Sequence, residues 1–262
     1  MSPAQRRFPL IFAAAGGLLV LFILLPLAIT LFSVPPADPS GTLSDPEVLA
    51  SLAVTFLAAS LATLIGLLGG VPLAYLLARV PFRGRALVSG LIDLPVIIPH
   101  TAAGIALLMV FGRQGLLGQA FGLVGLFFTD TLTGIVVAML FVGLPYLVNG
   151  SQTAFALLDP EMERVALIDG ASHWQAFWLV ALPQAWRGIL SGSLMMWARG
   201  ISEFGAVVIL AYHPRIIPVL IYERFQGFGL NAALAPSALL ILVALFIFVL
   251  VRALLQPVKE RP

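Results

Sequence analysis

Cysteine is absent from the 262 residues of this chain, and lysine occurs once, at Lys259. Without cysteine the chain has no disulfides and no thiolate metal ligands. No glycine-rich loop precedes Lys259, so the chain lacks a P-loop for nucleotide hydrolysis. Only three histidines occur, and neither a His-Glu-x-x-His sequence nor a hydrolytic triad pattern is present. We therefore expect no catalytic group and no metal site in this chain.

Charge is also scarce, since charged residues make up 10% of the chain and hydrophobic residues 60%. A bilayer span needs roughly 20 apolar residues, and the sequence offers about six such stretches. The composition predicts an all-α polytopic membrane protein with one transmembrane domain over residues 1–262. The expected spans are about 8–34, 49–78, 86–112, 132–148, 189–211 and 232–255. The basic balance rests on few charges, so it does not imply nucleic-acid binding.

Basic residues are distributed unevenly over the segments between these spans. With both termini inside, ten of the 14 Lys and Arg residues lie on the inner side, and Arg199 lies within a span. The outer three are Arg113, Arg215 and Arg224. Because basic residues accumulate in cytoplasmic loops, this asymmetry predicts a multi-pass protein of the cell (inner) membrane with both termini cytoplasmic. It also places residues 159–183 in the cytoplasm.

Residues 159–183 form the longest polar interruption of the sequence, and they predict two short helices. Asp159 is a suitable N-cap for the first helix, with proline next and the acidic residues Glu161 and Glu163 in the first turn. Gly170 stands where a left-handed residue ends a helix.

The second short helix is predicted to begin at Ser172, which forms a capping box with Gln175. An apolar stripe at helical spacing follows. It consists of Trp174, Phe177, Trp178 and Ala181. Pro183 is expected to end this helix. Two capped helices between spans indicate a docking surface, and an ordinary loop lying on the bilayer surface is the alternative.

The run Glu163-Arg-Val-Ala-Leu-Ile-Asp-Gly170-Ala-Ser172, followed by Phe177 and Val180-Ala-Leu-Pro183, resembles the EAA loop of ABC importer membrane subunits. In that family the loop inserts a coupling helix into a groove of the ATP-hydrolysing subunit. Here Arg164 occupies a position that is often acidic, and the acid stands one residue earlier. The resemblance implies ATPase-coupling roles for Glu161, Glu163, Arg164, Ala166, Gly170, Ala171, Ser172, Trp174 and Phe177.

Apart from Arg252, which is counted with the inner bases at the end of the last span, four ionisable residues lie within the expected spans: Asp93, His100, Arg199 and Glu203. A charge at the membrane centre costs about 2.5–3.5 kcal/mol on insertion scales, so each needs a partner or water. Arg199 and Glu203 are one helical turn apart and are expected to pair. That pair either locks the fifth span to a neighbour or lines a pathway, and both interpretations remain open. Asp93 is expected to satisfy the third-span backbone or Arg85, and His100 to be a packing residue.

Pro95 and Pro99 remove backbone donors from the third span and predict a bend or break there. A narrower resemblance rests on Pro95-x-x-x-Pro99-x-Thr101-x-x-Gly104, Phe111-Gly112, Arg199–Tyr212 and Pro218–Phe225. These stretches look like the permeases of molybdate/tungstate and sulfate importers, and most like the tungstate/molybdate members. We expect a translocation pathway or gate among Pro95, Pro99, His100, Thr101, Arg199, Ser202, Glu203 and Gly205.

The resemblance implies a homodimer in the lipid bilayer with a pathway along its two-fold axis. It also implies two ATP-binding cassette subunits on the cytoplasmic side and an external substrate-binding protein that delivers the oxyanion. This chain would bind no cofactor, because ATP and Mg belong to the ATPase subunit. Sulfate or another oxyanion is the alternative substrate.

Two other classes of protein are the rivals of this interpretation. A membrane-embedded enzyme needs clustered aspartates, clustered histidines or a Ser/Lys dyad, whereas the acids here are dispersed. A stand-alone secondary transporter or channel does not need a cytoplasmic two-helix dock.

Overall fold

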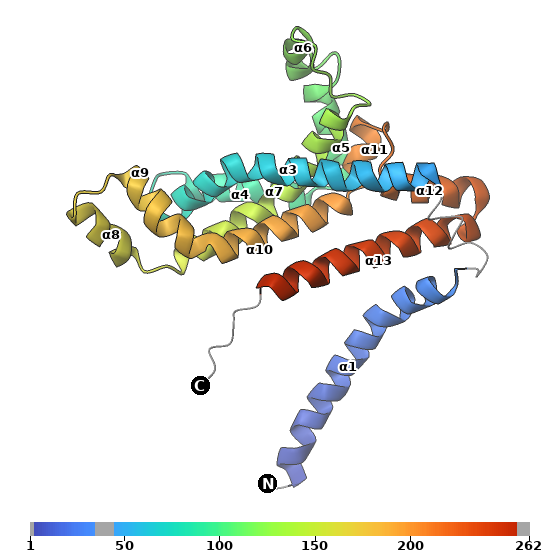
Figure 1. The fold of residues 1–262 in the computed structure, drawn as a ribbon, viewed down its shortest axis with the longest axis horizontal. Helices are drawn as coiled ribbons and strands as arrows, with labels where there is room; N and C mark the ends of the chain where they lie inside the picture. Colours follow the sequence, from blue (N-terminus) through green and yellow to red (C-terminus); the bar gives the residue numbers. More distant parts are fainter. Residues whose placement is uncertain (1–2, 35–44, 256–262) are drawn as a thin grey trace. The chain divides into compact units, whose positions relative to one another are not determined.

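A computed structural model describes residues 3–34 and 45–255 of the chain (Figure 1). Within these ranges every regular element is a helix. The α-helices are α1 (Pro3–Phe32), α3 (Pro46–Arg79), α4 (Arg85–Ile97), α5 (His100–Phe111), α6 (Leu116–Gly122), α7 (Leu132–Ala156), α8 (Pro160–Ile168), α9 (His173–Gln175), α10 (Leu182–Ile201), α11 (Gly205–Leu210), α12 (Ile217–Phe228) and α13 (Leu230–Leu255). A π-helix, η1 (Ala176–Ala181), connects α9 to α10.

The chain divides into two compact units, of which the first combines Met1–Leu49 with Leu220–Pro262. In this unit Arg224 of α12 pairs with Asp45 at 2.6 Å and with Glu47 at 3.2 Å. Asp45 Oδ1 also accepts the Glu47 backbone N–H at 2.9 Å. The pairing therefore ties α12 to the residues at which α3 begins.

The second unit, Ala50–Val219, contains residues 159–183 and the helices α4, α5, α10 and α11. Its centre is the packing of α10 against α7. Glycines bring these helices together, because a Cβ at Gly150 would lie 2.8 Å from Gly192 Cα, and one at Gly188 would lie 2.3 Å from Ala154 Cβ. Within this unit α8 and α9 lie at one end of α10, and α5 and α11 lie at the other (Figure 1).

Four described helices are long and apolar enough to cross a membrane. They are Phe12–Phe32, Pro46–Arg79, Leu132–Ala156 and Leu230–Val249, and the bent pair Arg85–Ile97 with His100–Phe111 makes a fifth candidate. These match five of the six expected spans. The expected span 189–211 is not among the candidates within the described residues.

The predicted break in the third expected span is confirmed. The helices α4 and α5 meet at an angle of 114°. Pro95 is buried inside α4, and Pro99 directly precedes α5. Proline lacks the N–H that a continuing helix needs and disfavours a helical conformation in the residue before it, and Ile98 is accordingly extended.

Two expectations for the next region were wrong. Pro183 does not end a helix, because it lies inside α10. The preceding π-turn, in which the Leu182 N–H donates to Phe177 O, offsets the carbonyls that a proline ring would meet in a regular helix. The expected single span 189–211 is instead interrupted at residues 202–204, between α10 and α11.

Candidate functional site

The local signals that predicted the first short helix of residues 159–183, hereafter the EAA-like segment, are confirmed. Asp159 caps α8, and its Oδ1 accepts the Glu161 N–H at 2.9 Å. Gly170 follows α8 with a φ of 93°, a left-handed conformation that suits glycine. The Ala171 N–H then donates to Ala166 O at 2.9 Å, so the chain turns sharply out of the helix.

The predicted capping box of the second short helix is also confirmed. Ser172 Oγ accepts the Gln175 N–H at 3.2 Å, and Gln175 Oε1 accepts the Ser172 N–H at 2.8 Å. The box therefore fixes the start of α9, which continues into η1 and α10.

The apolar stripe that follows divides between the core and the surface. Phe177 is buried, and its ring centroid lies 4.9 Å from that of Tyr75 and 6.2 Å from that of Phe155. Trp174 is 69% exposed and Trp178 47% exposed. Phe177 therefore anchors the segment, while the two tryptophans remain available at the surface.

Glu163 is likewise turned inward, with a side chain that is 11% exposed. Its Oε1 accepts a hydrogen bond from Arg79 Nε at 2.9 Å, and its Oε2 accepts one from the Tyr75 hydroxyl at 2.6 Å. Glu161 and Arg164 are exposed and pair with each other. The two acids of the first turn thus have different surroundings, which the sequence pattern did not distinguish.

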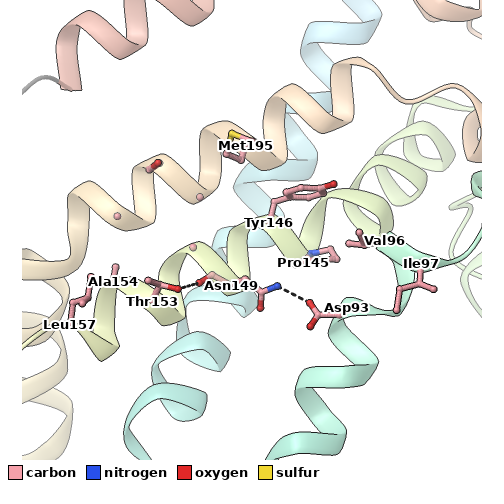
Figure 2. A pocket seen from close by; sticks show the side chains of 14 residues that line it. Asp93, Val96, Ile97, Pro145, Tyr146, Asn149, Thr153, Ala154, Leu157 and Met195 are labelled. Carbon is pink, nitrogen blue, oxygen red and sulfur yellow. Dashed lines mark hydrogen bonds between the residues drawn. The ribbon is translucent and has the colours of Figure 1, made fainter. Parts of the chain in front are cut away.

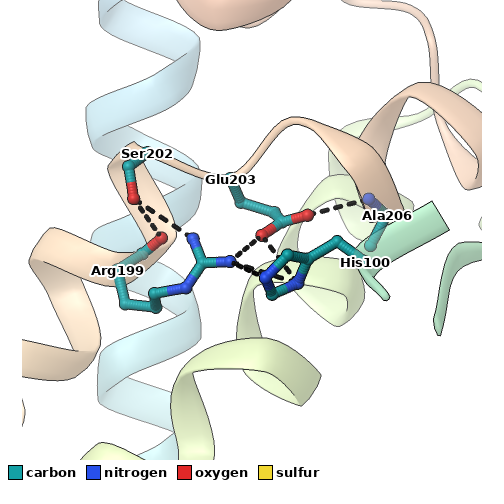
Figure 3. A network of polar contacts seen from close by, with 5 residues as sticks. All are labelled: His100, Arg199, Ser202, Glu203 and Ala206. Carbon is teal, nitrogen blue, oxygen red and sulfur yellow. Dashed lines mark hydrogen bonds and ion pairs between the residues drawn. The ribbon is translucent and has the colours of Figure 1, made fainter. Parts of the chain in front are cut away.

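A polar cluster of His100, Arg199, Ser202 and Glu203 forms where the two broken helices meet (Figure 3). The predicted pair is confirmed, with Arg199 Nη2 2.6 Å from Glu203 Oε2. The same Nη2 lies 2.7 Å from His100 Nε2, so His100 is a member of the cluster, beyond the packing role expected for it. Arg199 Nη1 donates to Ser202 Oγ at 3.1 Å.

Glu203 is the most buried member of the polar cluster, at 1% exposure. Its second oxygen, Oε1, accepts the Ala206 N–H at the start of α11 at 2.8 Å (Figure 3). Both carboxyl oxygens are therefore hydrogen-bonded, as a buried carboxyl group requires.

Two glycines allow α5 and α11 to approach at this point. A Cβ at Gly205 would lie 2.8 Å from His100 Cβ, and one at Gly104 would lie 2.8 Å from Ile209 Cβ. Because Gly205 has no side chain, the start of α11 can lie against His100 at the start of α5, and the polar cluster forms there. Thr101 is exposed on α5, and Pro95 is buried within α4 away from the cluster contacts.

A cavity of about 640 Å³ lies between α4, α7 and α10 (Figure 2). Its polar groups include Asp93, Tyr146, Asn149, Thr153 and Ser191. Asn149 Nδ2 donates to Asp93 Oδ1 at 2.6 Å. Asp93 thus bonds a neighbouring helix, a different partner from the expected backbone or Arg85.

Several residues of these sites were missed in the sequence. Asn149 begins the polar stretch Asn149–Thr153 directly after an apolar run, and such a polar group at the end of a span is a local signal of a partner inside the protein. Tyr75 and Arg79 carry no such signal, because an aromatic and a basic residue at the end of a span are ordinary interface features. Their contact with Glu163 joins residues more than 80 positions apart, at separations of 88 and 84.

Comparisons with known proteins place the chain in a family. The profile of the family described as "Binding-protein-dependent transport system inner membrane component" matches residues 70–260. The molybdate/tungstate transport system permease protein WtpB of Pyrococcus abyssi is 40% identical over 95% of this chain and 96% of that protein. A probable sulfate transport system permease protein cysT of Chlorokybus atmophyticus is 33% identical over 78% of this chain and 73% of that protein.

A solved structure shows the same fold. The crystal structure of a bacterial alginate ABC transporter, in complex with an alginate pentasaccharide-bound periplasmic protein, contains a chain that matches with a TM-score of 0.73. The match covers 94% of this chain and 93% of that chain at 18% identity, so it bears on the fold alone. With the family match and the curated relatives, this chain belongs to the binding-protein-dependent transport system inner membrane component family and is a membrane permease subunit of an ABC importer.

Proposed function

We propose that this permease carries tungstate or molybdate as part of a homodimer. An external binding protein delivers the anion, and two ATP-binding cassette subunits dock on the cytoplasmic side. The observation that carries the choice of anion is the 40% identity to a molybdate/tungstate permease over nearly the whole chain. The sulfate permease relative, at 33% over a smaller share, makes sulfate the second candidate.

The proposed ATPase-docking surface is the outer face of the EAA-like segment. Three apolar residues of α8 are exposed at three-residue steps and form one side of the helix: Met162, Val165 and Ile168. The exposed Trp174 and the turn at Gly170 adjoin them in sequence. Exposed apolar side chains on a short capped helix suit insertion into a groove of a partner. Glu163 and Phe177 support this surface from inside.

The proposed topology has six crossings with cytoplasmic termini. The four apolar helices and the bent pair α4–α5 supply five, and the broken pair α10–α11 supplies the sixth. The excess of basic residues on the proposed inner side supports this orientation. It puts the EAA-like segment in the cytoplasm.

The proposed pathway passes the junction of the broken helices. Interrupted helices at membrane depth are tolerated where they line a cavity or are covered by protein. Val96 and Ile97 line the 640 Å³ cavity, and Pro99 and His100 follow them in the chain. Thr101 lies exposed at the junction, and four side chains with N–H or O–H groups line that cavity beside Asp93: Tyr146, Asn149, Thr153 and Ser191. Such groups suit an oxyanion that binds weakly in transit.

Reconstitution tests the function directly. Liposomes that hold the permease and its ATPase, supplied with the binding protein, should accumulate labelled tungstate or molybdate only when ATP is present. Sulfate should compete weakly. Preferential uptake of sulfate would assign the chain to the second candidate. Uptake without the ATPase would favour a secondary transporter.

A further inference from the structure

The buried face of the EAA-like segment is fixed to α3 by a charged contact. Both carboxyl oxygens of Glu163 are occupied, one by Arg79 Nε at 2.9 Å and the other by the Tyr75 hydroxyl at 2.6 Å. Tyr75 and Arg79 are one turn apart at the end of the same helix. The side chains of Arg79 and Glu163 are only 14% and 11% exposed, so solvent screens their interaction little.

Arg79 also holds the entrance to the segment. Its Nη2 donates to Leu158 O at 3.1 Å, in the turn between α7 and α8. One guanidinium therefore bonds α8 and the turn that precedes it. A planar guanidinium suits this task because its donors point in fixed directions.

The Tyr75 ring adds an apolar contact to the same junction. It packs edge-on against Phe155 of α7 at 5.3 Å and against Phe177 of η1 at 4.9 Å. Tyr75 thus joins α3 both to α7, which precedes the EAA-like segment, and to η1 within the segment. The outer face of α8 takes no part in these contacts and remains exposed.

Several turns before Tyr75, the helix α3 also contacts α10 beside the polar cluster. Trp197 Nε1 donates to Ser60 Oγ at 3.1 Å, and the Trp197 ring lies 5.5 Å from that of Phe56. A Cβ at Gly200 would lie 3.4 Å from Ala59 Cβ. Trp197 and Gly200 flank Arg199 in sequence. The helix α3 therefore contacts the EAA-like segment at its end and the neighbours of Arg199 several turns earlier.

We propose that Arg79, Glu163 and Tyr75 are positioning residues that transmit the displacement of the EAA-like segment to α3, and through α3 to the polar cluster. The proposal rests on the proposed docking of this segment on the ATPase. Glu163 acts here through its own chain and does not contact the ATPase. Between Phe56 and Arg79 the helix α3 is unbroken, with Pro72 inside it, so a single helix carries both contacts.

The first test measures coupling in the assembled transporter. The variants are Arg79→Gln and Glu163→Gln, the reversed pair Arg79→Glu with Glu163→Arg, and the control Arg83→Gln, an exposed arginine in the next turn. Each is assayed for co-purified ATPase, basal ATP hydrolysis, and anions transported per ATP hydrolysed.

We expect both single variants to retain the ATPase and basal hydrolysis, because the outer face of α8 is unchanged. Anions transported per ATP should fall at least about fivefold, the lower end of typical coupling between sites. The reversed pair should exceed either single variant, and Arg83→Gln should match the wild type. Wild-type transport per ATP in both single variants overturns the proposal. So does loss of ATPase binding in Glu163→Gln, which makes Glu163 a docking residue and leaves the proposed function intact.

A milder variant covers the case in which the charge variants do not fold. Tyr75→Phe keeps the ring contacts and removes one hydrogen bond to Glu163. Tyr75→Phe should lower the number of anions transported per ATP by a smaller factor than Glu163→Gln. If the charge variants yield no protein, a Tyr75→Phe variant with wild-type transport per ATP overturns the proposal. Failure of the wild type to bind an ATPase or to transport with ATP would instead reject the proposed function.

The distance between α3 and the EAA-like segment can be measured with spin labels, and a mere loss of stability would not make this distance depend on ATP. Since the chain has no cysteine, Leu64→Cys on α3 and Asp169→Cys after α8 give a clean pair of spin-label sites. The distance between the labels should stay the same with and without ATP in the otherwise wild-type protein. It should change with ATP in the Glu163→Gln background. An unchanged distance in that background contradicts the proposal.

Discussion

The buried carboxyl group of Glu203 pairs with the Arg199 guanidinium at 2.6 Å. Their spacing predicted the pair, since residues four apart on a helix are neighbours. The spacing did not predict that His100 shares the guanidinium, because that contact joins two broken helices. Nor did it predict that Glu203 also accepts the Ala206 N–H. Glu203 is 1% exposed and bonds both Arg199 and the Ala206 N–H, so the pair is better explained by its part in holding the helices together than by a part in the pathway.

We predict that the pair is mainly structural. Removing one member of a buried pair commonly costs about 3–5 kcal/mol, whereas removing both is often nearly neutral. Arg199→Ala and Glu203→Ala should each lower the yield of folded protein. The double variant should recover yield and part of the transport. Yield in detergent and uptake in liposomes are the measurements. A double variant that folds normally yet is as inactive as Arg199→Ala would put Arg199 in the anion path.

At the scale of elements, the sequence predicted those features whose signals are local. The cap at Asp159, the left-handed Gly170 and the capping box at Ser172 all depend on residues within one turn. The continuation of the helix through Pro183 depends on a π-turn, and the break at residues 202–204 contains neither proline nor glycine. The break is accompanied by hydrogen bonds from Ser202 Oγ to Arg199 O and from the Ala206 N–H to Glu203 Oε1. A pattern of apolar residues, prolines and glycines reports neither these bonds nor the π-turn.

Gly170 provides a test at the same scale. Its φ of 93° costs a β-branched residue roughly 1–2 kcal/mol, and no neighbour lies within 4 Å of a Cβ there, so the effect is conformational. We expect Gly170→Val to lower anion-stimulated ATP hydrolysis while the spans stay folded. Gly170→Asn, which tolerates this conformation, is the matched control and should retain most of the stimulation. Full stimulation in Gly170→Val would count against docking through this turn.

The contact between α12 and the start of α3 predicts a dependence on pH. The hydrogen bond from Arg224 holds the pKa of Asp45 below its ordinary value of 3.8. A carboxyl group with a lowered pKa stabilises the fold above its unfolded pKa, and this contribution is lost as the pH falls through the folded pKa. Thermal stability in detergent should therefore drop between pH 5 and pH 3 by more in the wild type than in Asp45→Asn. Equal losses would show that the pair contributes nothing.

For the whole molecule, hydropathy identified the apolar helices but not the number of crossings. The helices α1, α3, α7 and α13 qualify by length and composition within the described residues, and the bent pair α4–α5 qualifies as one span. The pair α10–α11 is not among these candidates, and α10 contains Arg187, Arg199 and several uncharged polar residues. Whether that pair crosses the membrane decides on which side the C-terminus lies.

Reporter fusions after Gly41, Arg83, Leu158 and Gln256 count the crossings directly, and Gly41 and Gln256 lie outside the described residues. With the N-terminus inside, six crossings predict the order out, in, in, in. Five crossings, without α10–α11, predict out, in, in, out. Four crossings, without either broken pair, predict out, in, out, in. The basic asymmetry favours the first pattern. An outward signal at Leu158 would remove the EAA-like segment from the cytoplasm and end the docking proposal, whereas an outward signal at Gln256 alone would leave docking intact and reject the α10–α11 crossing.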